Sequence, residues 1–205
     1  MGTIALPRHA AVILALVLAA GCSGLEVGRD VQAGRMALQG RRPEEAVTYL
    51  SRAAQSDPTY KLPTRARESV FTYLGRAYYE TGDDARARAA LQRALLDDKS
   101  DPLAHLYLGL TLYRSSDRDQ GRKEIETGLN GIHAWLDEVG ADGVYGPYWD
   151  PARAIRIAIE RTLGGKPEAG ELTASAQRIG RQFDIELDRA SQAESESIYQ
   201  KGGKD

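Results

Sequence analysis

The sequence is poor in the residues that build disulfides and metal sites. It has one cysteine, so no disulfide forms within the chain, and its histidines, His9, His105 and His133, are too scattered for a metal site. Blocks of like charge are also absent, because 27 basic and 29 acidic residues are interspersed and the formal net charge is -2. A chain without a basic patch is not expected to bind nucleic acid. We therefore predict no metal, no non-covalent cofactor and no nucleic-acid partner.

Long apolar runs are missing as well. The run from Ala10 to Ala20 spans eleven residues, whereas a helix that crosses a bilayer needs about twenty. Arg8 precedes this run and Leu18-Ala-Ala-Gly-Cys22 ends it, which is the pattern of a secretory signal. A permanent transmembrane helix and ordinary secretory cleavage nearby are the alternatives.

The small residues directly before Cys22 resemble the lipobox of bacterial lipoproteins, although Ala19 stands where leucine is most common. The resemblance implies that residues 1–21 are a removed signal peptide and that residues 22–26 are a lipidated linker. Cys22 would carry a diacylglyceryl group, with a further acyl chain such as palmitate on the new amino terminus. Ser23 stands where an aspartate would favour retention at the inner membrane, so the resemblance implies the periplasmic face of the cell outer membrane.

The middle of the sequence repeats every 34 residues. Leu74-Gly-Arg-Ala-Tyr-Tyr79 aligns without gaps with Leu108-Gly-Leu-Thr-Leu-Tyr113, an offset of 34 (108 minus 74). Small residues such as Gly75 and Ala87 alternate with large ones such as Tyr78, as two closely crossing helices require. The segment from Leu74 to Asp98 resembles the tetratricopeptide repeat (TPR).

This resemblance implies an all-α fold, a right-handed superhelical array of about three helix-turn-helix repeats. The repeat region is expected at 27–138, with copies at 27–60, 68–101 and 102–135 and an extended last helix. About seven extra residues, near 61–67, separate the first two copies as a loop or a longer helix. Gly121 and Gly128 stand at the crossing positions of the third copy, where alanine is usual, which predicts very close packing there.

Residues 139–193 are predicted to cap the array. A glycine-rich and aromatic loop precedes a helix that starts at Asp150-Pro151 and ends near residue 163. A last helix, 171–193, carries an apolar stripe that must be buried. The stripe consists of Leu172, Ala176, Ile179, Phe183, Leu187 and Ala190. Residues 194–205 are expected to form a flexible tail.

Candidate partner-binding residues follow from the resemblance, because the first helices of TPR repeats line a concave groove. They are Arg35, Gln39, Tyr73, Arg76, Tyr79, Glu80, Tyr107, Leu110, Tyr113 and Arg114. Arginine and tyrosine lose little entropy per buried area and dominate binding hot spots. The third copy is too apolar for a solvated surface. Either the C-terminal helices cover it or a peptide or partner helix binds there.

A second candidate surface lies in the loop before the predicted capping helices. It consists of Tyr145, Tyr148 and Trp149. These aromatic residues either dock the following helix as a hydrophobic staple or present an interaction patch to a partner.

No motif in the sequence places a nucleophile beside a base or pairs carboxylates in a pocket, so the chain is not expected to be an enzyme. The prediction is a lipid-anchored periplasmic scaffold or adaptor that binds a peptide or partner protein in envelope assembly or maintenance. The alternative is a binding module for cell-wall polymer or another small ligand. Homo-oligomerisation stays open, and fold alone does not identify the partner.

Overall fold

The computed structural model describes the backbone of residues 8–165 and 167–202 and the side chains of residues 24–165 and 167–200. The helices are α1 (Arg8–Gln39), α2 (Pro43–Ser56), α3 (Val70–Thr81), α4 (Asp84–Asp97), α5 (Pro102–Arg114), α6 (Arg118–Gly140), the short 3-10 helix η1 (Gly146–Tyr148), α7 (Ala154–Gly164) and α8 (Ala169–Gly202). In these ranges the one β-type pairing is an isolated bridge between Lys61 and Ser69.

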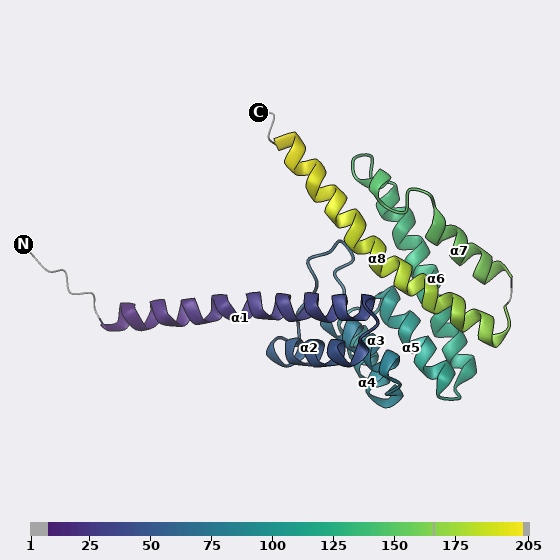
Figure 1. Cartoon of the computed structure of the whole chain (residues 1–205), viewed down its shortest axis with the longest axis horizontal. Helices are drawn as coiled ribbons and strands as arrows, with labels where there is room; N and C mark the ends of the chain where they lie inside the picture. Colours follow the sequence, from purple (N-terminus) through teal and green to yellow (C-terminus); the bar gives the residue numbers. More distant parts are fainter. Residues whose placement is uncertain (1–7, 166, 203–205) are drawn as a thin grey trace, which may run out of the picture.

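Consecutive helices pair into three hairpins, α1 with α2, α3 with α4 and α5 with α6 (Figure 1). The chain is therefore the all-helical array that the repeat pattern predicts. Figure 1 also shows α8 running across the array beside α7, with its C-terminal end projecting away from the repeats. The N-terminal part of α1 also projects beyond the packed helices, toward the left of the view.

Local sequence signals set the ends of the repeat helices. Ser69 begins α3 by accepting a hydrogen bond from the backbone N–H of Phe71, and Gly82 ends it with a φ of 84° that favours glycine. Asp83 and Asp101 cap α4 and α5 in the same way, accepting from the third backbone N–H that follows each. These caps satisfy N–H groups that have no partner inside the helix.

The third hairpin is packed through glycine, as the sequence predicts. A Cβ added at Gly109 would lie 2.5 Å from the backbone nitrogen of Ile125, and one added at Gly121 would lie 2.6 Å from that of Tyr113. At Gly128 the added Cβ would lie 2.5 Å from the nitrogen of Leu106. Because the neighbouring atoms are backbone, α5 and α6 would have to separate to admit a methyl group.

Gly128→Ala is expected to lower the free energy of unfolding by about 1 to 3 kcal/mol, since overpacking outweighs the gain of about 1 kcal/mol in helix propensity. Gly170 in α8 is a matched control, because nothing lies within 4 Å of a Cβ added there. Gly170→Ala should leave stability unchanged or raise it. Urea unfolding of both variants measures these changes. Equal changes in the free energy of unfolding would contradict the close crossing of α5 and α6.

The N-terminal repeat differs from the sequence prediction at its start. Its first helix is part of α1, which is continuous from Arg8 and does not begin near residue 27. The extra residues form a loop between Asp57 and Ser69, in which Leu62 N–H donates to Glu68 O at 2.9 Å. The loop alternative for the insertion is thus confirmed.

The capping helices also differ from their predicted bounds. α7 begins at Ala154, not at Pro151, because Arg153 is its N-cap residue with a left-handed φ of 54°. The predicted end of the last helix at residue 193 is wrong, since α8 continues to Gly202. Glu194, assigned to the tail by sequence, accepts a hydrogen bond from Trp149 Nε1 at 2.5 Å.

Candidate functional site

The concave face, formed by α1, α3 and α5, is occupied largely by the chain's own α8. Every residue of the predicted apolar stripe on α8 is at most 1% exposed. Gly180 allows the close approach, since a Cβ there would lie 2.9 Å from Leu106 Cδ2 and 3.1 Å from Tyr107 Oη. The interpretation that the C-terminal helices cover the third copy is therefore confirmed.

Asp184 of α8 is the polar centre of this contact. Its side chain is 0% exposed and accepts hydrogen bonds from Arg35 Nη2 at 2.8 Å, Tyr73 Oη at 2.9 Å and Arg76 Nη1 at 3.1 Å. One carboxylate thus joins α1 and α3 to α8. Asp188, one turn later, adds a contact to Arg35 at 2.6 Å.

The charge state of Asp184 follows from these partners. Burial raises the pKa of a carboxyl group, but here Arg76 and Arg35 outweigh it and hold the pKa of Asp184 below its ordinary value of 3.8. A lowered folded-state pKa stabilises the protein above the unfolded value, and this stability is lost as pH falls through the folded one. The cluster is therefore ionised at neutral pH.

The structure reassigns most of the predicted groove residues. Arg35, Tyr73, Arg76, Tyr79, Tyr107 and Leu110 are each at most 6% exposed. The first three hold Asp184, and Arg76 Nε also donates to Glu80 at 2.9 Å. Arg35, Tyr73 and Arg76 therefore bind the chain's own helix and are not free to bind a partner.

The remaining predicted groove residues lie toward the edges. Gln39 is exposed and donates to Asp188 at 2.8 Å, and Tyr113 is partly buried against the core. Arg114 pairs with Asp84, and its guanidinium carbon lies 4.2 Å from the centre of the Tyr79 ring.

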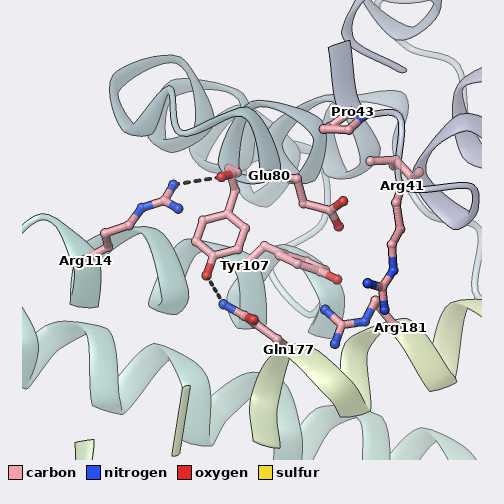
Figure 2. Close-up of a pocket in the computed structure, with 9 residues that line it drawn as sticks. Arg41, Pro43, Glu80, Tyr107, Arg114, Gln177 and Arg181 are labelled. Carbon is pink, nitrogen blue, oxygen red and sulfur yellow. Dashed lines mark hydrogen bonds between the residues drawn. The ribbon is translucent and has the colours of Figure 1, made fainter. Parts of the chain in front are cut away.

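A pocket remains open where α8 leaves the concave face uncovered. This groove pocket has a volume of about 380 Å³ and is lined by Leu38, Arg41, Pro43, Tyr79, Glu80, Tyr107, Arg114, Gln177 and Arg181. Figure 2 shows Arg41, from the turn between α1 and α2, and Arg181, from α8, pointing into the same part of it. Sequence reasoning missed both arginines, because it did not place α8 beside the α1–α2 turn.

Glu68, on the inserted loop, is a buried acid with one unpaired oxygen. Its Oε2 accepts from Thr64 Oγ1 at 2.6 Å, but Oε1 has no hydrogen-bond partner. Burial is the largest cause that raises the pKa of Glu68 to about 7 from 4.5, and nearby Asp101 adds to it. The charged form is thus disfavoured in the folded state.

A raised folded-state pKa means that stability is full below pH 4.5 and falls as pH rises toward about 7. Glu68→Gln is therefore expected to raise the free energy of unfolding by up to about 3 kcal/mol at pH 8 and little at pH 4. Denaturant unfolding at both pH values measures this. Glu45→Gln, at an exposed ion pair with Arg42, should show no such difference, and a pH-independent effect of Glu68→Gln would contradict the assignment.

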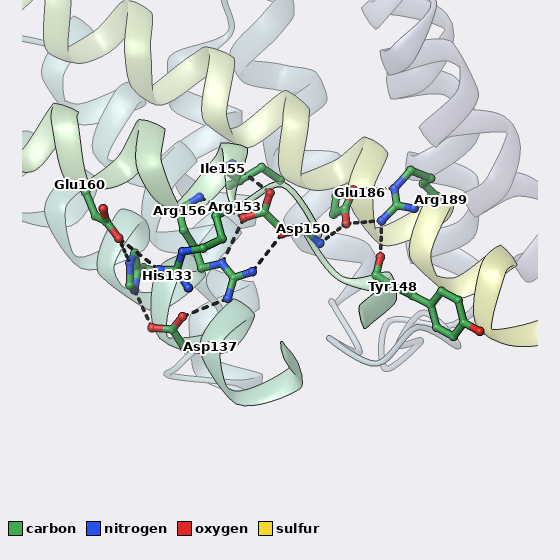
Figure 3. Close-up of polar contacts among 10 residues, drawn as sticks. All are labelled: His133, Asp137, Tyr148, Asp150, Arg153, Ile155, Arg156, Glu160, Glu186 and Arg189. Atoms are coloured by element: carbon green, nitrogen blue, oxygen red, sulfur yellow. Dashed lines mark hydrogen bonds and ion pairs between the residues drawn. The ribbon is translucent and has the colours of Figure 1, made fainter. Parts of the chain in front are cut away.

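The second candidate surface is partly internal. Trp149 is 1% exposed, and its ring meets that of Trp135 edge-on at 5.0 Å. Tyr145 and Tyr148 are partly buried, and Arg189 of α8 donates to the Tyr148 carbonyl (Figure 3). Trp149 therefore docks the loop onto α6 and α8, whereas the staple alternative predicted docking onto the following helix.

Polar contacts fix the segment that follows this loop (Figure 3). The Asp150 carboxylate accepts from the backbone N–H groups of Ile155 and Arg156 at 3.1 and 3.2 Å. Arg156 also bridges to Asp137 of α6 at 3.2 Å. The Asp150 side chain thus caps α7, as predicted, although Asp150 lies three residues before the N-cap residue Arg153.

Over the described residues, no group of three or more acidic, histidine or cysteine side chains is arranged to hold a metal ion. In the same part of the chain, no helix is sufficiently long and apolar to cross a bilayer. The side chain of Cys22 lies outside the described residues, so its lipidation stays a prediction.

Comparison with known protein families finds a match, and it lies in the repeat region. A model of the TPR repeat matches residues 75–116, which hold most of α3, all of α4 and α5, and the turns between them. This part of the chain is similar to a tetratricopeptide repeat. No curated protein matches the chain. TPR repeats generally mediate interactions between proteins, and helical scaffolds of this kind are typically not enzymes.

Proposed function

We propose that this TPR protein is a lipid-anchored periplasmic scaffold that recruits a protein partner in envelope assembly or maintenance. The observation that carries the proposal is the groove pocket, which opens on the concave face of a TPR array beside arginine and tyrosine side chains. These side chain types dominate binding hot spots. A catalytic role is not part of the proposal.

The position of α8 supports binding at the groove pocket rather than along the whole concave face. The apolar residues of the third repeat are already buried by the α8 stripe. A partner that displaced α8 would have to break the buried contacts of Asp184, and loss of one member of a buried ion pair costs about 3 to 5 kcal/mol. Binding beside α8 avoids this cost.

The anchor is proposed from the lipobox-like sequence. α1 extends past the packed repeats in Figure 1, and among its described side chains, from residue 24 on, the first that is buried in the core belongs to Val27. Cleavage before Cys22 would therefore leave the repeats intact and a short spacer between them and the membrane. Two or more acyl chains are needed for stable anchoring.

Site-specific photo-cross-linking in the bacterial envelope tests the proposal. A benzophenone amino acid replaces Pro43 at the groove pocket, or Arg88, which is exposed on α4, as the matched control. We expect a defined protein adduct in the membrane fraction from position 43 and none from position 88. Adducts with glycan alone would contradict the protein scaffold, and an unchanged mass and fractionation of Cys22→Ala would contradict the anchor.

A further inference from the structure

Two arginines of the groove pocket have no acidic partner among the residues that the structure describes. Arg41 and Arg181 are both exposed, and both guanidinium groups point into the same part of the pocket without a bond to any residue drawn there (Figure 2). Like charges that converge in a partly enclosed space repel each other. An anion between them would remove this repulsion.

The other charged groups of the groove pocket are already paired. Glu80 accepts from Arg76 Nε at 2.9 Å, and Arg114 is held by Asp84 and by the Tyr79 carbonyl at 2.8 Å. The unbalanced charge of the pocket is therefore positive and belongs to Arg41 and Arg181. Glu80 sets the limit of the anion site on the α3 side, where a second negative charge would be repelled.

A buried donor lies in the same pocket wall. Tyr107 is 1% exposed, lines the pocket, and its hydroxyl has no hydrogen-bond partner. Buried hydroxyl groups are ordinarily paired, and an unpaired one costs about 1 to 3 kcal/mol. Figure 2 shows this hydroxyl directed toward the side of the pocket where Arg181 lies. This hydroxyl is therefore free to form a hydrogen bond with a polar atom of a ligand.

We propose that the groove pocket binds a carboxylate of an acidic peptide segment, with Arg41 and Arg181 as the anion-binding residues. Guanidinium groups bind carboxylates in a planar, two-pronged geometry that an amide does not reproduce. Leu38, Pro43 and the Tyr79 ring supply an apolar wall for the neighbouring residue of the peptide. The volume of about 380 Å³ lies within the range of about 300 to 1,000 Å³ typical of ligand sites.

This inference rests on the proposed scaffold function and names the chemistry of the partner. The arginines come from the α1–α2 turn and from α8, so the site exists because the C-terminal helix folds back onto the repeats. A chain with open repeats and no α8 would lack Arg181 at this place.

Arginine side-chain NMR of the full chain in non-ionic detergent tests the site. The probe is the peptide acetyl-Ala-Leu-Glu-Glu-amide, and its control is acetyl-Ala-Leu-Gln-Gln-amide. We expect the Nε–H signals of Arg41 and Arg181 to shift with the glutamate peptide alone, and the binding to weaken with added salt. Equal shifts with the glutamine peptide, or none with either, would overturn the proposal.

Three variants sharpen the assignment. Arg41→Gln and Arg181→Gln are each expected to weaken glutamate-peptide binding about tenfold, which corresponds to about 1.4 kcal/mol. Arg178→Gln is the matched control on α8, because Arg178 is exposed and lies outside the groove pocket, and it should bind as the native chain does. Thermal unfolding should be unchanged or slightly raised in the first two variants, which excludes a folding defect.

Three further outcomes are decisive, and the last two separate this inference from the scaffold function. Inorganic phosphate that binds at least as tightly as the glutamate peptide would show a general anion site and overturn the peptide assignment. A protein adduct from another groove-pocket position, Gln177, that persists in the Arg41→Gln, Arg181→Gln double variant would leave the scaffold standing and remove the carboxylate role. Binding of the glutamate peptide without any protein adduct in the envelope would support the carboxylate site and contradict the scaffold function.

Discussion

Asp184→Ala is expected to lower the free energy of unfolding by about 3 to 5 kcal/mol, because it leaves Arg35 and Arg76 buried without their shared anion. Both guanidinium groups are on side chains at most 3% exposed. Tyr73 would lose the acceptor of its hydroxyl as well. Urea unfolding measured by circular dichroism gives the loss.

Asp188→Ala is the matched control for this variant. Asp188 lies one turn from Asp184 on the same helix and also contacts Arg35, but its side chain is 38% exposed. Solvent-exposed ion pairs contribute about 0 to 1 kcal/mol. Similar losses in the two variants would show that the Asp184 cluster is solvated, and would contradict the buried contact between α8 and the repeats.

Phe183→Ala is expected to cost a comparable 3 to 5 kcal/mol, about the range for removing a buried aromatic side chain. Phe183 is 0% exposed, and its ring meets that of Trp135 edge-on at 5.4 Å. The cavity would open between α8 and α6 in the middle of the core. The emission of Trp135 should shift to longer wavelength, and the unfolding midpoint should fall.

Ile185→Ala provides the comparison on the outer side of the same helix. Ile185 is 56% exposed, so its removal takes little apolar area out of contact and should change stability by less than about 0.5 kcal/mol. Equal effects at positions 183 and 185 would mean that α8 has no defined inner face.

The repeat helices could be predicted because their local signals agree with their packing. Gly75, Ala87 and Leu91 recur in an arrangement that two crossing helices require, and the caps at Asp83 and Asp101 mark helix starts in the sequence itself. The start of α7 and the end of α8 were missed for the opposite reason. Arg153 adopts a left-handed φ that no residue type signals, and α8 continues through polar residues whose helix is not marked by an apolar stripe.

Sequence reasoning placed three of the groove residues on the correct face but assigned them to a partner, whereas they bind the chain's own α8. Arg35, Tyr73 and Arg76 occupy positions that face the groove, but Asp184 on a distant helix binds all three. A signal was present, because Asp184 lies between Gly180 and Leu187 on the apolar face of its helix, where a charge needs a buried partner. Arg41 and Arg181 carried no such signal, since their proximity depends on how α8 docks.

Hydrogen–deuterium exchange of the full chain tests the central claim, that α8 is a folded part of the repeat core, most directly. Amides of residues 176–190 should be protected to the same degree as those of α5, because they open only when the core does. Amides of residues 195–200, which extend past the array, should exchange much faster and serve as the internal reference. Equally fast exchange in both parts of α8 would show an open concave face and contradict this account.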